Sequence, residues 1–112
     1  MYEIKPILRG KPFVREIESL SEEKRKTLFL RYSKIILSNF SSLHIKEIWK
    51  DDQLFKYAYY WFSASNNLIL GWDNAPHHKV KTFPHHRHTP DGVEPSDERN
   101  LPDVIDYITG IF

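Results

Sequence analysis

Residues 42–72, SLHIKEIWKDDQLFKYAYYWFSASNNLILGW, decide the fold of this chain. Apolar and polar residues alternate over residues 42–49, which is the period of two expected for a β-strand. The next apolar stretch, residues 54–62, carries aromatic side chains at every second position: Phe55, Tyr57, Tyr59 and Trp61. Residues 68–72 supply a third apolar run, and polar residues separate the three. The sequence therefore predicts three antiparallel strands joined by tight turns.

The flanking residues add further elements. Residues 1–12 contain Pro6, Gly10 and Pro12 and predict an irregular or barely helical segment. Residues 13–17 predict a short strand. Residues 28–37 favour a strand because β-branched and aromatic residues are frequent there, although residues 21–24 can also cap a helix.

The C-terminal segment predicts a short amphipathic helix. Asn100 is a suitable cap, Pro102 is tolerated in the first turn, and Val104, Ile105 and Ile108 form an apolar face. The expected fold class is α+β: an antiparallel β-meander of about five strands with a C-terminal helix packed on one face, in a single domain spanning residues 1–112. One helix covers little of so much aromatic surface, which suggests a homodimer or a partner protein on the sheet.

Composition narrows the setting in which the chain works. It has no cysteine, so disulfides and thiolate metal sites are excluded and a cytoplasmic location is expected. No apolar run approaches the roughly 18–20 residues that span a bilayer, so no membrane role is expected. Residues 1–50 hold eleven Lys and Arg against six Asp and Glu. A basic half of this kind attracts an anion or a nucleic acid, or is an ordinary solvated surface.

A dense histidine cluster carries the functional argument. Five of the six histidines fall within residues 77–88, in the runs WDNAPHH (72–78) and FPHHRH (83–88). Histidine exchanges protons near neutral pH and is the commonest metal ligand, so the cluster predicts one site. If residues 85–88 are extended, His86 and His88 share one face, with His85 and Arg87 on the other.

Three chemistries compete for this cluster. In the first, one neutral and one protonated histidine cleave a phosphodiester without metal, and Arg87, Lys79 or Lys81 holds the phosphate. In the second, His86, His88 and Asp73, with His77 or His78, hold a divalent metal whose identity is undetermined. In the third, Asp73 and Asn74 tie the turn, and the histidines bridge the loop to the sheet.

Outside the histidines, Glu47 shares strand parity with apolar residues and is a candidate to orient a histidine. Tyr59, Trp61 and Trp72 can stack unpaired bases, although the aromatic stripe favours a core role. The candidate catalytic residues are therefore Glu47, Asp73, His77, His78, His85, His86 and His88. The candidate substrate-binding residues are Tyr59, Trp61, Trp72, Asn74, Lys79, Lys81 and Arg87.

The runs WDNAPHH (72–78) and TFPHHRH (82–88) resemble the TumE-type toxins of toxin–antitoxin modules, whose corresponding runs are RYDNAPHH and FPHHKH. Residues 42–47 and 56–61 are similar to the family's acidic strand and Tyr-rich hairpin, so the resemblance covers roughly residues 13–110. One departure is that Gly71 stands where the family has Arg. The resemblance implies a cytoplasmic toxin that is held by a cognate antitoxin and acts on RNA.

Together these observations favour a toxin that acts on RNA, with the histidine-rich residues 77–88 as an acid/base or phosphate-binding centre. A ribonuclease-like or other RNA-directed hydrolase is one activity that such a centre allows. The alternatives are a module that binds nucleic acid or protein without catalysis, and a metal-dependent phosphodiesterase.

Overall fold

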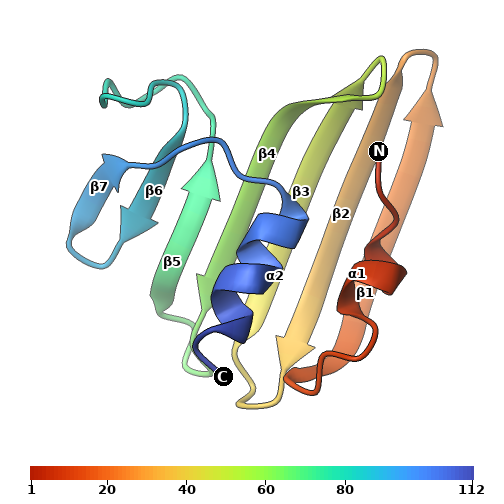
Figure 1. Ribbon diagram of the computed structural model, residues 1–112, viewed down its shortest axis with the longest axis vertical. Coiled ribbons are helices and arrows are strands. Elements are labelled where there is room, and N and C mark those ends of the chain that lie inside the picture. The colour runs from red at the N-terminus through yellow and green to blue at the C-terminus, as the bar shows by residue number, and fades with distance from the viewer.

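Seven antiparallel strands follow one another across one sheet in the order of the sequence, and both helices lie on one face of it (Figure 1). The computed structural model describes residues 1–112. The elements are α1 (Ile4–Leu8), β1 (Val14–Arg25), β2 (Leu28–Leu37), β3 (Ser42–Lys50), β4 (Gln53–Phe62), β5 (Leu68–Asp73), β6 (His86–Thr89), β7 (Gly92–Pro95) and α2 (Leu101–Thr109). Neither helix has the length and apolar character that crossing a membrane requires.

Short hairpin turns set the meander. Asp51 and Asp52 have φ angles of 49° and 63° between β3 and β4. Two successive positive φ angles give a turn whose twist matches that of the paired strands, and aspartate tolerates this conformation better than most residues. Asn66 has a φ angle of 67° between β4 and β5. The sequence pattern at both turns therefore holds each strand beside the preceding one.

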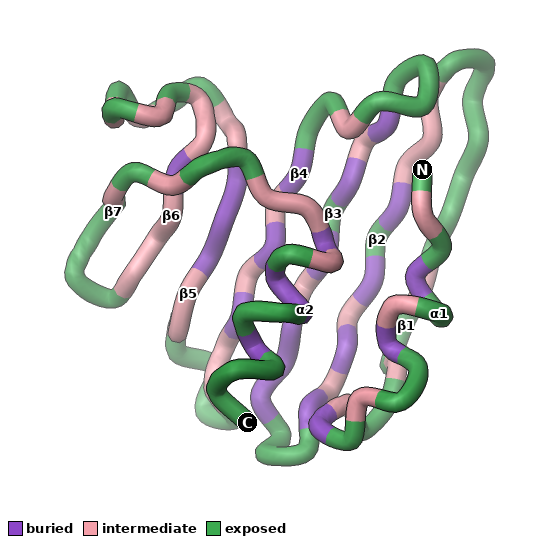
Figure 2. Tube along the Cα trace, viewed as in Figure 1, coloured by how far each residue is buried: buried purple, intermediate pink, exposed green.

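The core lies between the helices and the covered face of the sheet. Alternate residues of the central strands are buried, as Figure 2 shows by the repeated change of colour along β2, β3 and β4. The α2 helix closes the core over these strands. The core residues are Ile4, Leu8, Phe13, Ile35, Leu37, Leu43, Ile45, Tyr57, Tyr59, Trp61, Trp72, Leu101, Val104, Ile105 and Ile108.

The predicted cap of α2 is confirmed. The Asn100 side chain accepts a hydrogen bond from the Asp103 amide at 2.9 Å, and the Asp103 carboxylate accepts one from the Asn100 amide at 3.0 Å. This capping box satisfies two amides that the first helical turn leaves without partners. It also fixes the chain that connects β7 to the helix.

The α+β architecture and the strand at residues 28–37 are confirmed, but the strand count is seven rather than about five. The first strand continues from residue 14 to Arg25, because its exposed second half pairs with β2 at the sheet edge. The strands β6 and β7 were missed because their four-residue segments are polar and show no apolar alternation. Phe55 leaves the aromatic stripe, because the register shifts opposite Ile48 and Trp49 and leaves its ring 53% exposed.

Candidate functional site

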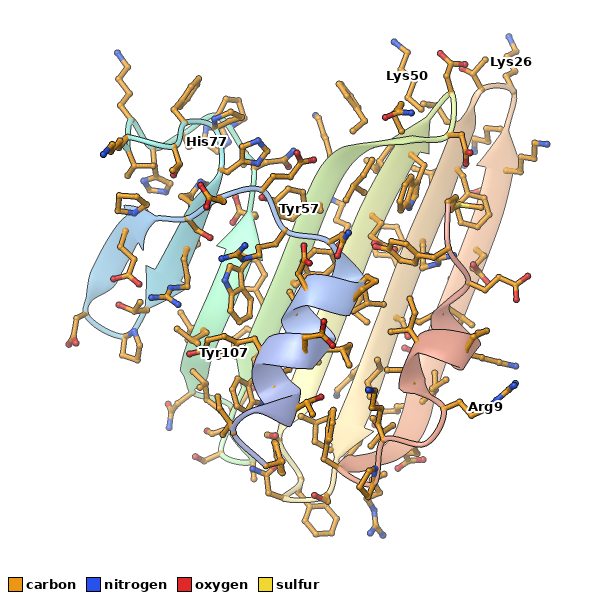
Figure 3. The ribbon with its side chains drawn as sticks, in the orientation of Figure 1. Arg9, Lys26, Lys50, Tyr57, His77 and Tyr107 are labelled. Carbon is orange, nitrogen blue, oxygen red and sulfur yellow. The ribbon has the colours of Figure 1, made fainter.

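Asp73, His78, His86 and His88 converge on the face of the sheet that the helices leave open; we call them the histidine cluster. Asp73 ends β5 and pairs with His86 of β6, while Gly71 pairs with His88. His86 and His88 therefore project from the same face, as their spacing of two predicts. His78 comes from the loop between the two strands, at the edge of the molecule where Figure 3 labels the neighbouring His77.

The polar atoms of the cluster are close enough to act on one centre. The two carboxylate oxygens of Asp73 lie 2.9 Å from His86 Nε2 and 3.2 Å from His88 Nε2. These two ring nitrogens are 3.0 Å apart. One ring nitrogen of each of three histidines, His78, His86 and His88, lies within 4.8 Å of the other two. The ring centroids are 4.8–5.3 Å apart.

The backbone determines which nitrogen of His86 faces the cluster. His86 Nδ1 lies 2.8 Å from the Pro84 carbonyl oxygen, which can only accept a hydrogen bond. The Nδ1 atom therefore carries the proton, and in the neutral ring Nε2 presents its lone pair to His88 and Asp73. The side chain of His86 is fully buried beside the Asp73 carboxylate.

Burial lowers the pKa of His88, and the nearby His86 and His78 rings act in the same direction, whereas the Asp73 carboxylate opposes the shift. The neutral form of His88 is therefore favoured relative to a free histidine. Imidazole nitrogens together with one carboxylate are the donor set that zinc and other borderline divalent cations prefer. The residues present can hold such a cation: three nitrogen ligands from His78, His86 and His88, with Asp73 beside them.

Tyr60 of β4 holds Asp73 from the other side. Its hydroxyl donates a hydrogen bond to the Asp73 carboxylate. Burial, followed by that hydrogen bond and the carboxylate charge, raises the pKa of Tyr60, so the hydroxyl keeps its proton at neutral pH. The Tyr60 ring lies over Gly71, where an added Cβ would be 2.3 Å from the ring carbon Cδ1. A glycine at position 71 therefore allows Tyr60 to reach Asp73.

A hollow of about 440 Å³ opens beside Asp73 on the same face. The side chains of Lys46, Lys56 and His77 line it, together with the loop that follows β5. These three groups can carry positive charge next to the cluster. The hollow is therefore suited to an anionic group such as a phosphate.

Other predicted residues lie near the cluster without joining it. The exposed His77 lines the hollow. His85 faces the other way, and its Nδ1 lies 2.9 Å from the Tyr57 hydroxyl. Asn74 ties the loop to β4, since its side chain accepts a hydrogen bond from the Tyr57 amide at 3.0 Å and donates one to the Phe55 carbonyl at 3.1 Å.

Glu47 lies in a different network. Its carboxylate accepts hydrogen bonds from Arg31 at 2.8 Å, from Tyr59 at 2.6 Å and from Tyr2. No hydrogen bond or ion pair joins it to any histidine. The predicted orienting role is replaced by a buried ion pair, because the parity of β3 directs Glu47 to the helix-covered face.

The aromatic candidates for base stacking are corrected as well. Tyr59, Trp61 and Trp72 are only 0–3% exposed and pack in the core. A buried ring offers no face to a base, so the core role that the stripe favoured is the observed one.

The basic residues predicted to bind substrate lie in different parts of the molecule. Arg87 projects from β6 opposite His86 and His88, and it pairs with Glu94 of β7. Its charge is thus matched by a carboxylate rather than offered to a phosphate at the cluster. Lys79 and Lys81 are exposed in the loop before β6.

The sequence analysis did not predict three residues near the cluster, Tyr60, Lys46 and Lys56. Their positions on the polar side of the alternation in β3 and β4 were the available signal.

Comparison with known proteins places the chain in a family. The model of the family described as Toxin TumE matches residues 4–112. No curated protein and no solved structure matches the chain. The chain therefore belongs to the TumE toxin family, as the resemblance of its histidine runs predicted.

Proposed function

Taking as premise that this chain is the toxin of a toxin–antitoxin module with a cognate antitoxin, we propose that it hydrolyses phosphodiester bonds of RNA at a divalent cation held by the histidine cluster. The observation that carries the proposal is the convergence of three ring nitrogens within 4.8 Å beside the Asp73 carboxylate. Packing alone does not require three imidazole rings to converge beside one carboxylate.

The short distance between His86 Nε2 and His88 Nε2 supports a cation. Because the Pro84 carbonyl fixes the proton of His86 on Nδ1, the Nε2 lone pair points at His88 only 3.0 Å away. Two nitrogens that bind one zinc ion at about 2.0–2.1 Å in tetrahedral geometry lie roughly 3.3 Å apart. The observed separation is close to that value, so small movements would bring both rings onto one ion.

The surroundings fit hydrolysis of a phosphodiester. A bound cation of this kind acts as a Lewis acid and lowers the pKa of a water ligand. In the net reaction one water adds to phosphorus and one P–O ester bond breaks, which leaves a phosphomonoester and a hydroxyl group. Asp73, oriented by Tyr60, would bind the cation through one carboxylate oxygen, and its other oxygen can accept the proton that the attacking water loses. Lys46, Lys56 and His77 can hold the non-bridging oxygens in the adjacent hollow.

Purified protein incubated with end-labelled RNA tests the proposal. We expect cleavage that stops when EDTA is added and returns with zinc or manganese. His86→Ala should lose cleavage, whereas His85→Gln, which alters the histidine just before β6 whose ring faces Tyr57, should keep it.

Two outcomes contradict the proposal. Cleavage that persists in EDTA and leaves cyclic-phosphate ends would favour the metal-free histidine pair. A protein that arrests growth in cells but cleaves no RNA under any metal condition would favour a binding module without catalysis.

A further inference from the structure

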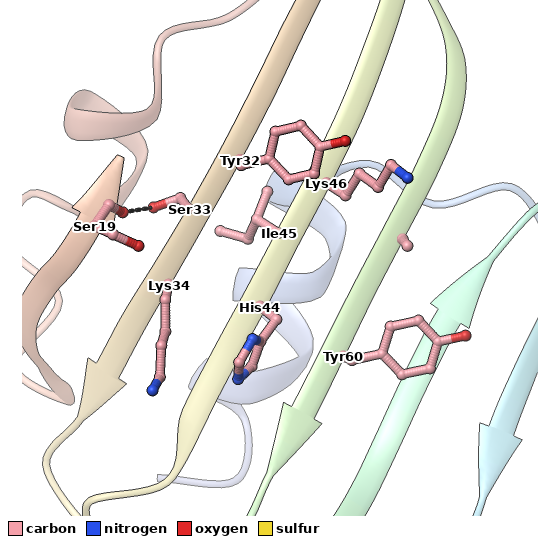
Figure 4. Close-up of a pocket in the computed structure, with 9 residues that line it drawn as sticks. Ser19, Tyr32, Ser33, Lys34, His44, Ile45, Lys46 and Tyr60 are labelled. Carbon is pink, nitrogen blue, oxygen red and sulfur yellow. Dashed lines mark hydrogen bonds between the residues drawn. The ribbon is translucent and has the colours of Figure 1, made fainter. Parts of the chain in front are cut away.

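A groove with basic and aromatic walls crosses the open face of the sheet and ends at the histidine cluster. It consists of two hollows of about 440 Å³ each that share Lys46 and Ala58. The first extends over β2, β3 and β4 from Tyr32 to Tyr60. The second continues from Lys46 to Asp73. Figure 4 shows the first hollow with α2 on the far side of the sheet, so neither helix covers it.

The groove carries three lysines against two carboxylates, Glu18 beside Lys34 and Asp73 in the second hollow. The side chains of Lys34, Lys46 and Lys56 line the two hollows. The strands β2, β3 and β4 contain one carboxylate, Glu47, and it is buried on the opposite face. The one acidic partner of these lysines is Glu18 of the edge strand β1, which lies 3.0 Å from Lys34. The charge of the groove is therefore complementary to a polyanion.

Aromatic rings lie between the lysines. Tyr32 is 48% exposed at one end of the first hollow, and the Lys46 ammonium group lies 5.6 Å from the centre of its ring. Tyr60 forms the other end of the first hollow (Figure 4), and its hydroxyl donates a hydrogen bond to Asp73 of the cluster. Exposed rings beside cations on an open sheet are the arrangement on which the bases of single strands stack.

We infer that this groove binds single-stranded RNA and leads its backbone to the histidine cluster, an inference that rests on the proposed function. Tyr32 stacks a base, Lys34 and Lys46 contact phosphates, and Lys56 places the next phosphate beside Asp73. The path from β2 to β5 covers three strand spacings, roughly 14 Å. An RNA occupant is favoured over a protein because lysine is depleted in the cores of protein interfaces.

Binding of a fluorescent decauridylate to the full-length protein in EDTA tests this inference without cleavage. Lys46→Ala should weaken binding, and the slope of log K against log[salt] should fall by about 0.7, as expected for one lost phosphate contact. Tyr32→Ala should weaken binding at least about fivefold, because it removes the ring on which a base stacks. The slope should change little, because stacking does not release counterions. Lys5→Ala and Tyr107→Ala, which alter exposed residues of the two helices on the other face, should bind as the wild type does.

The following outcomes test whether the groove binds RNA, once circular dichroism has shown that the variants are folded. Wild-type affinity and salt slope in both groove variants would overturn the inference, and so would equal losses in the two helix variants. Loss of antitoxin binding with unchanged RNA affinity would reassign the groove to a protein partner. The failure of the proposed function has a different signature: RNA binding that responds to Lys46→Ala and Tyr32→Ala, with no cleavage under any metal condition.

Discussion

The two faces of the sheet each hold a cluster of buried polar side chains, and the clusters differ in how their charges are matched. On the covered face, Arg31 donates hydrogen bonds to Glu47 at 2.8 Å, to Glu22 at 3.0 Å and to the Tyr2 carbonyl at 2.8 Å. Glu47 in turn accepts hydrogen bonds from Tyr59 and Tyr2. We call Arg31, Glu47, Tyr2 and Tyr59 the arginine cluster. Each of its charges faces an opposite charge or a donor.

In the histidine cluster on the open face, three imidazole rings converge beside one carboxylate, and no lysine or arginine joins them. Burial of polar groups alone does not mark the candidate site, because the arginine cluster is the more deeply buried of the two. The convergence of three ring nitrogens beside one carboxylate, without an arginine or lysine among them, is what makes the histidine cluster the candidate cation site.

The largest effect is expected in the arginine cluster. Glu47→Gln keeps the shape of the side chain but leaves Arg31, which is 1% exposed, without its buried counter-charge. Breaking a buried pair on one side typically costs about 3–5 kcal/mol. Denaturant unfolding should show a loss of that size, whereas His88→Gln in metal-free protein should cost much less. Equal losses in the two variants would remove the distinction between the clusters.

The next effect concerns the response to metal. If the histidine cluster binds zinc, zinc at a hundred times its Kd should raise the free energy of unfolding by about 2.7 kcal/mol. His86→Ala should abolish that gain, because it removes the nitrogen that lies closest to Asp73. Unfolding with and without zinc measures both. A gain that survives in His86→Ala would place the metal elsewhere.

A smaller effect is expected from Tyr60→Phe, which removes the hydroxyl that holds Asp73. Groups that orient a metal ligand typically change metal affinity by roughly 10–100-fold. Calorimetric titration with zinc should show a loss in this range, and Tyr107→Phe serves as a control on the covered face. Unchanged affinity would mean that Asp73 takes no part in holding the ion.

Gly71→Ala should produce a similar loss through a different cause. The added Cβ would lie 2.3 Å from the Tyr60 ring, so the ring must move and its hydrogen bond to Asp73 must break. The loss in the double variant with Tyr60→Phe should be close to that in Tyr60→Phe alone. Fully additive losses would show that Gly71 acts independently of Tyr60.

The smallest effect concerns His44, the one histidine outside residues 77–88. Burial, and then the charge of Lys34, lower the pKa of His44. The unfolded chain therefore binds a proton more readily at this position, so stability should fall as the pH drops from about 6.5 through the lowered pKa. Unfolding of wild type and His44→Gln over this range should show a steeper fall for the wild type. Parallel curves would contradict the direction of the shift.

The sequence predicted those parts of the molecule that depend on local pattern. Alternation in residues 42–62 predicted β3 and β4, and Asn100 with its neighbours predicted the start of α2. The spacing of His86 and His88 predicted that they share a face. In each case the information lies within a few residues of the chain.

The remaining features depend on which strands lie next to each other. Tyr60 reaches Asp73 because Gly71, its partner on β5, has no side chain, and this pairing requires knowledge of the register. The alternation of β3 shows which face Glu47 lies on, but its partner Arg31 comes from the neighbouring strand. The sequence predicted that Arg87 binds a phosphate, but the β6–β7 hairpin places Glu94 opposite it.

The measurement that most directly tests the cation site is an anomalous difference map at the zinc absorption edge, from crystals grown with zinc. We expect one strong peak about 2.0–2.1 Å from the Nε2 atoms of His86 and His88, with a nitrogen of His78 as a third ligand. Clear density for the three rings with no peak between them, or with a peak at other residues, would contradict the assignment.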